Sequence, residues 1–263
     1  MYTVLTIAGS DSSGGAGVQA DLKTIAALGA FGMSAITALT AQNTMGVTGI
    51  SEVEPEFLRK QISEVFEDIR PDAVKIGMVS NAELVTVIAD ELKKYSAKHI
   101  VVDPVMVATS GSRLTKTDAV RAMTEELFPL AEIITPNLSE LSALVDWDIK
   151  TTDEMADAAE RIAKRYNTTV LAKGGHLKDD AVDILAFPKG ALYALKSKRI
   201  DNPNTHGTGC TLSSAIATNL AKGITLKESV KQAKEYVRGA IATKLKLGKG
   251  RGPLNHMYHF YKF

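Results

Sequence analysis

Two patterns of hydrophobic residues, one typical of strands and one typical of helices, alternate along this chain. Short apolar runs, typical of buried strands, cover Val4–Ala8, Ala35–Ala41, Ala73–Ile76, Ile100–Val102, Glu132–Ile134 and Val170–Ala172. Segments with apolar residues three or four positions apart predict helices over Val18–Leu28, Glu56–Ile69, Ala82–Tyr95, Asp118–Phe128, Leu138–Val145 and Glu154–Tyr166. Parallel strands need crossover connections, and helices supply them, so the alternation predicts an α/β fold with a mostly parallel sheet.

The last third of the chain departs from this alternation. The runs Val182–Phe187 and Ala191–Ser197 are separated only by Pro188, Lys189 and Gly190, which predicts an antiparallel hairpin at an edge of the sheet. Two long helices, Thr208–Leu220 and Leu226–Leu247, then complete the predicted elements. The chain shows no repeat and no linker, so we expect residues 1–263 to form a single domain.

Composition narrows the class of protein. With 263 residues, 45% of them hydrophobic and 23% charged, the chain can bury a sizeable core, which excludes disordered, collagen-like and disulfide-scaffold proteins. Lys and Arg total 31 and Asp and Glu total 30, so charge favours neither a nucleic-acid nor a membrane partner. The uncharged stretch from Thr24 to Ser51 is interrupted by glycines and polar residues and predicts no membrane span. The lone cysteine, Cys210, and the lack of a basic leader favour a cytoplasmic protein.

The loops that follow strands are the expected place for chemistry, because ligands of open α/β sheets bind beyond the carboxyl ends of the strands. The loop Gly9–Gly17 is rich in glycine and lets a ligand approach the backbone closely. A tight turn with a helix cap explains it equally well. Its spacing fits neither the dinucleotide-binding fingerprint nor the phosphate-binding loop that carries a lysine.

A second small-residue turn, Asn204–Thr211, opens a predicted helix. Backbone N–H groups at Gly207, Thr208, Gly209 and Cys210 would point at one spot, with the helix dipole behind them, and suit an anion such as a transferring phosphoryl group. Cys210 is either an inert core residue or a base, and we expect its place at a helix N-terminus to lower the pKa of the thiol.

The two glycine-rich segments resemble motifs of a known protein family. The Gly-Thr-Gly-Cys turn resembles the anion-hole motif of the ribokinase superfamily, in which Gly-X-Gly-Asp is commoner. Cysteine at that place, together with Ala8–Gly17, resembles the hydroxymethylpyrimidine kinase branch, which includes related pyridoxal kinases. Thr40–Thr44, Val102–Met106 and Thr135–Glu140 match as well, so the resemblance spans essentially the whole chain. It implies a ribokinase-like three-layer α/β/α sandwich.

The resemblance also implies a nucleotide and metal site. Asn137 and Glu140 follow the strand at Ile134 and would organise Mg²⁺ of a bound ATP through water, together with Asp103. Without the resemblance, Asn137 and Glu140 read as a helix capping box, and Asp103 as a turn former. Lys173 ends a strand before two glycines, where its ammonium would reach nucleotide phosphates; a surface lysine is the alternative.

Gln42 is the candidate residue for substrate recognition. Its carboxamide offers a donor beside an acceptor, which complements a 4-aminopyrimidine edge; a turn-capping glutamine is the alternative. The resemblance adds four residues to the substrate site: Asp21, Gly9, Met78 and Val105. His206 would simply shape the anion turn. The histidines His99, His176, His206, His256 and His259 lack metal-ligand spacing, so we expect no zinc site.

The function implied is ATP- and magnesium-dependent phosphorylation of 4-amino-5-hydroxymethyl-2-methylpyrimidine to its monophosphate and then to its pyrophosphate, in thiamine biosynthesis. Cys210, Gly207, Thr208, Gly209 and Lys173 would carry the catalysis. A pyridoxal kinase on the same scaffold is the close alternative, and a nucleotide-binding regulator without turnover is the alternative from another class. The uncharged early strands and the resemblance favour a homodimer. The tail from Gly248 to Phe263 has no assigned role.

Overall fold

The computed structural model describes residues 1–106, 117–175, 181–198, 200–243 and 245–260. Of the residues considered above, His176, residue 244 of the last predicted helix and residues 261–263 of the tail lie outside these ranges. The strands are β1 (Thr3–Asp11), β2 (Phe31–Asn43), β3 (Gly46–Glu52), β4 (Ala73–Ile76), β5 (Ile100–Val102), β6 (Ile133–Ile134), β7 (Thr169–Ala172), β8 (Ala181–Ala186) and β9 (Leu192–Ser197). The α-helices are α1 (Gly17–Ala27), α2 (Pro55–Asp68), α3 (Ala82–Lys94), α4 (Thr117–Ala122), α5 (Leu138–Val145), α6 (Thr152–Tyr166), α7 (Thr208–Ala221) and α8 (Leu226–Ala242).

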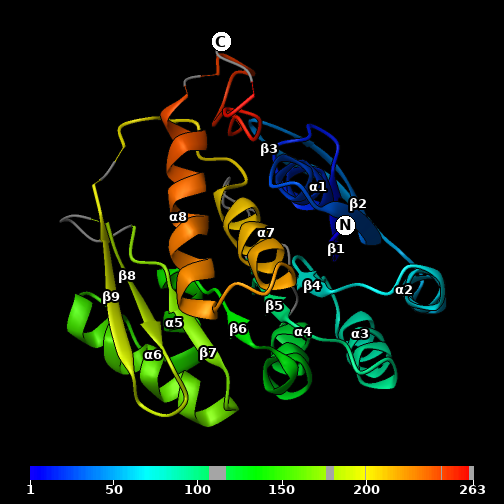
Figure 1. Cartoon of the computed structure of the whole chain (residues 1–263), viewed down its shortest axis with the longest axis horizontal. Helices are drawn as coiled ribbons and strands as arrows, with labels where there is room; N and C mark the ends of the chain where they lie inside the picture. Colours follow the sequence, from blue (N-terminus) through cyan, green and yellow to red (C-terminus); the bar gives the residue numbers. More distant parts are fainter. Residues whose placement is uncertain (107–116, 176–180, 199, 244, 261–263) are drawn as a thin grey trace.

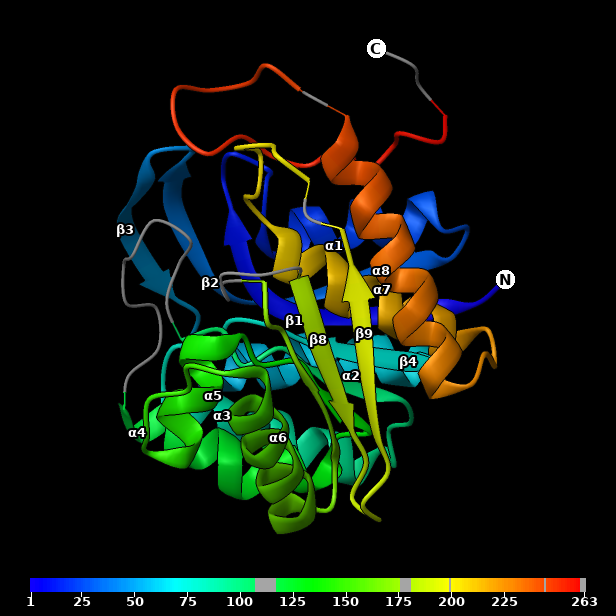
Figure 2. The same ribbon diagram turned by 90° about the vertical axis from the view of Figure 1, so that its left-hand side faces the viewer.

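The strands of the described residues form one nine-stranded sheet in the order β3-β2-β1-β4-β5-β6-β7-β8-β9. The pairs from β2 to β7 are parallel, whereas β3 pairs antiparallel with β2, and β8 and β9 form an antiparallel hairpin at the other edge. Helices cover both faces of this sheet (Figures 1 and 2). The predicted three-layer α/β/α sandwich with a mostly parallel sheet and a late antiparallel hairpin is confirmed.

Alternation along each strand divides the core between the two faces. Leu5, Ile7, Val74 and Ile76 pack with α2 to α6, whereas Val4 on β1 packs with α1, α7 and α8. Because both faces are covered, the central strands read as continuous apolar runs. This is why the sequence places β4 and β5 at their observed bounds, whereas helical spacing places α5 at its bounds.

The predictions are wrong at three places. Strand β3 was missed because almost all of its residues are exposed, so it lacks a buried alternation, and with β2 it makes a second antiparallel hairpin. Helix α8 ends at Ala242 instead of Leu247. The predicted helix Asp118–Phe128 changes after α4 into a π-helical turn, Met123–Leu127, and a 3₁₀ turn that contains Pro129.

The described part of the tail, residues 248–260, packs against the anion turn and helices α7 and α8. Leu254 is buried with α7 and α8, and the backbone N–H of His206 donates to the carbonyl of Gly252. His256 lies 3.0 Å from Thr211 Oγ1, and its carbonyl accepts a hydrogen bond from Tyr236. Among the described residues, no helix has both the length and the apolar character that crossing a membrane requires.

Candidate active site

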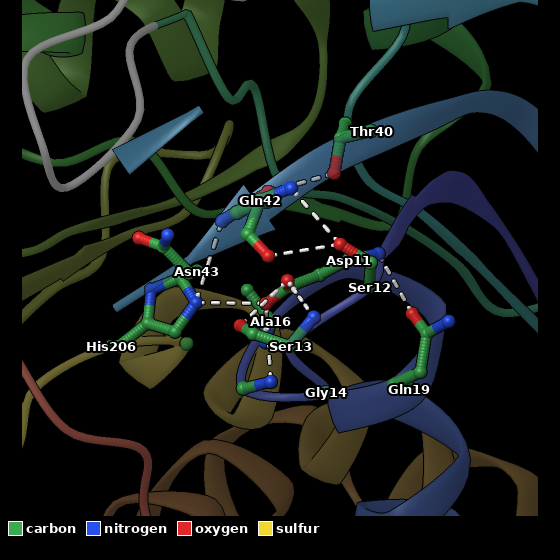
Figure 3. A network of polar contacts seen from close by, with 12 residues as sticks. Asp11, Ser12, Ser13, Gly14, Ala16, Gln19, Thr40, Gln42, Asn43 and His206 are labelled. Atoms are coloured by element: carbon green, nitrogen blue, oxygen red, sulfur yellow. Dashed lines mark hydrogen bonds and ion pairs between the residues drawn. The ribbon is translucent and has the colours of Figure 1, made fainter. Parts of the chain in front are cut away.

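The glycine-rich loop after β1 is folded around the carboxylate of Asp11 (Figure 3). Oδ1 accepts hydrogen bonds from the N–H and the hydroxyl of Ser13, both at 2.8 Å. Oδ2 accepts from the N–H groups of Gly15, at 3.1 Å, and Ala16, at 2.8 Å, and lies 2.8 Å from His206 Nε2. Burial works against ionisation of Asp11, but these hydrogen bonds, led by that of His206, outweigh it and lower the pKa of the carboxyl to about 2.

The loop and the anion turn interlock through glycine. Gly207 is the N-cap of α7 with φ +83°, and a Cβ there would lie 1.9 Å from the carbonyl oxygen of Gly15. A Cβ on Gly17, at φ +56°, would lie 2.3 Å from the carbonyl oxygen of Gly9. The two turns that the sequence singled out are therefore in direct contact at the carboxyl edge of the sheet.

Cys210 lies in the first turn of α7, as expected, and is half-buried. The predicted lowering of its pKa is wrong. Burial raises the pKa of the thiol to about 11, and the opposing effects of the Lys75 cation and the Gly17 N–H do not compensate. The loss of water around the sulfur thus determines the direction of the shift.

Lys173 and Asp103 form an ion pair beside this turn. Lys173 Nζ lies 3.0 Å from Asp103 Oδ1, which also accepts a hydrogen bond from Thr135 Oγ1 at 2.9 Å. A Cβ on Gly209 would lie 3.2 Å from Asp103 Oδ2 and 3.4 Å from Lys173 Nζ. A side chain at this position would therefore be in tight contact with the ion pair, so glycine lets the first turn of α7 approach the pair closely.

Asn137 and Glu140 form the capping box of α5. Asn137 Oδ1 accepts from the N–H of Glu140 at 2.9 Å, and Glu140 Oε2 accepts from the N–H of Asn137 at 2.8 Å. Burial raises the pKa of Glu140 to about 7, with Lys173 opposing the shift and Asp103 adding to it. The capping interpretation is confirmed, and it occupies one oxygen of each side chain.

Gln42 lies near the end of β2 and is tied to the loop by its backbone. Its N–H donates to Ser12 Oγ and its carbonyl accepts from the same hydroxyl, both at 2.9 Å. The carboxamide is partly exposed and points toward His206 (Figure 3). It therefore lies where the loop and the anion turn meet.

The other expected substrate residues divide into two groups. Met78 is buried against Gly9, where a Cβ would lie 3.0 Å from its sulfur, and Val105 follows Asp103 in the loop after β5. Met78 and Val105 lie on loops at the carboxyl edge and Gly9 lies near the end of β1, so all three are at this edge of the sheet. Asp21, in contrast, has no exposed surface, so the structure gives it no free position for a substrate.

Asp21 pairs instead with Lys75, a residue that the sequence analysis missed. Lys75 Nζ lies 2.8 Å from Asp21 Oδ2, and both side chains are fully buried. Asp21 also accepts hydrogen bonds from Thr6 at 2.6 Å and from Ser214 at 2.7 Å. The available signal was a single charged residue within the four-residue strand AVKI.

This fold and this edge, with an anion turn beside a lysine and an aspartate, define a ribokinase-like phosphotransferase. The family model described as phosphomethylpyrimidine kinase matches residues 11–255. The chain therefore belongs to the phosphomethylpyrimidine kinase family.

Relatives and solved structures agree with this membership. The chain is 51% identical over 261 residues to the hydroxymethylpyrimidine/phosphomethylpyrimidine kinase of Rhizobium meliloti, covering 98% of each chain, and 42% identical over 260 residues to that of Escherichia coli, again covering 98% of each. The crystal structure of a Clostridium difficile phosphomethylpyrimidine kinase matches 92% of this chain and all of its own, with 48% identity and a TM-score of 0.82. A Staphylococcus aureus pyridoxal kinase in complex with AMP-PCP and pyridoxal matches 98% of this chain and 94% of its own, with 32% identity and a TM-score of 0.90.

Proposed function

We propose that this protein uses ATP and Mg²⁺ to phosphorylate the hydroxymethyl group of 4-amino-5-hydroxymethyl-2-methylpyrimidine and then the resulting monophosphate, as a step of thiamine biosynthesis. Family membership supports the reaction class, and the names of the relatives support the pyrimidine as substrate. The observation that carries the proposal is the contact of the Lys173–Asp103 pair with the glycine turn that opens α7.

Phosphoryl transfer passes through a loose transition state, so positioning and charge stabilisation matter more than a strong base. The N–H groups of Gly207, Gly209 and Cys210 lie at the helix N-terminus and would stabilise the developing charge, whereas the N–H of Thr208 donates to the carbonyl of Thr205 at 3.3 Å. Asp103 and Glu140 raise the pKa of Lys173 against the effect of burial, so its ammonium stays charged and adds to this stabilisation.

Cys210 is the candidate acceptor of the hydroxyl proton in the first transfer. Only its thiolate form can take this proton, and burial keeps the thiolate fraction small near neutral pH. The monophosphate accepts the second phosphoryl group through an oxygen that is already ionised. The second transfer therefore does not need the thiolate, which explains how one site can serve both steps.

The residues near Lys173 also fit a magnesium ion that is held mainly by the nucleotide. Asp103 and Glu140 offer carboxylate oxygens, the ligands Mg²⁺ prefers, and Asn137 would act through water. Within the described ranges no three His, Cys, Asp or Glu side chains cluster to form an all-protein metal site, which suits an ion that keeps its waters and phosphate ligands. When bound, the ion would neutralise phosphate charge.

The experiment that tests the proposal incubates the purified protein with ATP, Mg²⁺ and either the aminopyrimidine or pyridoxal, and follows the products by mass spectrometry. Mono- and diphosphorylated pyrimidine is the expected result. Phosphorylation of pyridoxal alone would overturn the substrate assignment. Thermal stabilisation by ATP without ADP release would indicate a binding protein instead.

We also propose that residues 1–263 act as one cytoplasmic kinase domain and as a homodimer. One sheet runs through the described strands, which supports a single unit. The β2–β3 hairpin exposes Leu39 on one face and Ile50 on the other, which supports an interface that includes this hairpin. A dimer mass in analytical ultracentrifugation that Leu39→Glu converts to a monomer mass is the expected result.

A further inference from the structure

His206 connects two elements of the site that lie far apart in the sequence. Its Nε2 lies 2.8 Å from Asp11 Oδ2, and both side chains are almost fully buried. Asp11 is ionised at neutral pH and can only accept hydrogen bonds, because its pKa is lowered to about 2 by its hydrogen bonds despite its burial. The Nε2 atom of His206 must therefore carry a proton and donate it to Asp11.

This proton constrains the neighbouring carboxamide of Gln42 (Figure 3). Gln42 Nε2 lies 3.4 Å from His206 Nε2, so with the nitrogen on this side two N–H donors face each other. Gln42 Oε1 lies 3.0 Å and the carbonyl oxygen of Ser10 lies 2.9 Å from Thr40 Oγ1, whose single hydrogen can serve only one of these two acceptors. Two mismatches thus surround one side chain.

Half a turn of the carboxamide removes both mismatches. Its oxygen then accepts from His206 Nε2–H, which Asp11 shares, and its nitrogen donates to Thr40 Oγ1. The terminal torsion of glutamine is soft and roughly two-fold, so the side chain reaches this orientation without moving its stem. Asp11 and Ser10 thereby determine, through His206 and Thr40, which end of the carboxamide is the acceptor.

We propose that His206, held by Asp11, is a specificity-determining positioning residue that fixes the Gln42 carboxamide with its oxygen toward His206 and so selects a 4-aminopyrimidine over a 4-oxopyrimidine. The inference rests on the proposed function. A 4-aminopyrimidine presents an amino donor beside the N3 acceptor, whereas the 4-oxo tautomer presents a carbonyl acceptor beside an N3–H donor. The two edges are complementary to opposite orientations of one carboxamide, so a carboxamide that cannot turn rejects the oxo compound.

The experiment compares kcat/KM for the amino substrate with that for its 4-oxo analogue, in which only the exocyclic group and the N3 proton differ. The His206 ring packs directly on Gly15, where a Cβ would lie 2.3 Å from the imidazole. His206→Phe keeps a ring in this place and so preserves the packing, but it removes the hydrogen-bond donor. His206→Gln restores a donor near the Nε2 position, because Asp11 attracts the amide nitrogen. His256→Phe is the matched control, since His256 is equally buried but pairs with Thr211 instead.

We expect the amino-to-oxo ratio to fall by about ten- to hundredfold in His206→Phe, the range that one mismatched buried hydrogen bond produces. The ratio should recover in His206→Gln and stay at the wild-type value in His256→Phe. Because His206 acts through Gln42, His206→Phe added to Gln42→Ala should not change the ratio further. Thermal melts and ATP affinity of every variant establish that the fold is intact.

The outcomes separate this inference from the proposed function. If the wild-type protein phosphorylates neither pyrimidine, the proposed function fails. If it phosphorylates the amino compound but accepts the oxo analogue equally well, or if His206→Phe lowers both activities by the same factor, the positioning role of His206 is refuted. An unchanged ratio in His206→Phe refutes it as well. Should His206→Phe not fold, Thr40→Val decides, because loss of the Thr40 acceptor should lower the ratio and an unchanged ratio refutes the fixed carboxamide.

Discussion

Asp11→Asn tests whether the glycine-rich loop depends on a charged acceptor. The carboxylate accepts five hydrogen bonds, two at Oδ1 and three at Oδ2. Asparagine keeps the shape but replaces one oxygen with an NH₂ group. If the NH₂ group takes the place of Oδ1, the N–H of Ser13 loses its acceptor. If it takes the place of Oδ2, the donors of Gly15, Ala16 and His206 lose theirs. Neither orientation satisfies the loop.

The magnitude follows from the pKa of Asp11. A fall from 3.8 to about 2 corresponds to about 2.4 kcal/mol of preference for the ionised form in the folded protein. Allowing for partial screening by solvent at the loop, we expect Asp11→Asn to lower the free energy of unfolding by about 2 kcal/mol. For a domain of this size the melting temperature should fall by about 4–8 °C.

The sign of the pH dependence provides the sharper test. Because the folded pKa lies below the unfolded one, ionised Asp11 stabilises the fold fully above about pH 4, and this contribution is lost as the pH falls toward 2. Urea unfolding should therefore give a difference between wild type and Asp11→Asn that shrinks to roughly half by pH 3. Asp201→Asn, at an exposed aspartate, is the control and should differ little from wild type. A difference that stays constant from pH 7 to pH 3 would refute the reasoning.

Three further predictions concern the chemistry and the buried charges. Cys210→Ala should slow the first transfer at least about tenfold and the second transfer much less. In the wild-type protein, the rate of the first transfer should rise about tenfold per pH unit between pH 7 and 9. Equal losses in single-turnover assays of the two steps would exclude the thiolate as base. Lys75→Met should cost about 3–5 kcal/mol in urea unfolding, because Asp21 is left buried without its cation, and Lys75→Met/Asp21→Asn should cost less; a double variant less stable than the single one would contradict this. Asn137→Ala should cost about 1 kcal/mol through loss of the α5 cap and Asn137→Asp little, and equal unfolding curves for all three proteins would show that the cap does not stabilise the fold.

The sequence predicts the layered fold well, because burial on both sheet faces leaves continuous apolar runs at the central strands. It misses β3, since an exposed edge strand needs no hydrophobic pattern. It also singles out the two glycine turns as the candidate site, because small residues at a helix N-terminus are visible in the sequence itself. Their contact through Gly207 and Gly15 depends on tertiary packing, which no local pattern encodes.

The prediction for the Cys210 thiol failed for a related reason. The helix N-terminus is a local feature that the sequence reveals, and it lowers a thiol pKa. Burial is a tertiary property, and here it raises the pKa to about 11. The contact of His206 with Asp11 could not be predicted for the same reason, because 195 positions separate the two residues in the chain.

The Lys75–Asp21 pair shows what such a hidden contact does for the site. Lys75 lies on a strand covered on both faces, so its ammonium needs a buried counter-charge, and Asp21 supplies it from α1. Asp21 also accepts a hydrogen bond from Ser214, which lies one helical turn after Cys210 on α7. The pair therefore joins β4, α1 and α7 at the level of the thiol, and its cation lowers the pKa of Cys210 against the effect of burial. The pH midpoint for alkylation of Cys210, the only cysteine, should thus be higher in Lys75→Met than in the wild-type protein. An unchanged midpoint would show that the pair stabilises the fold without acting on the thiol.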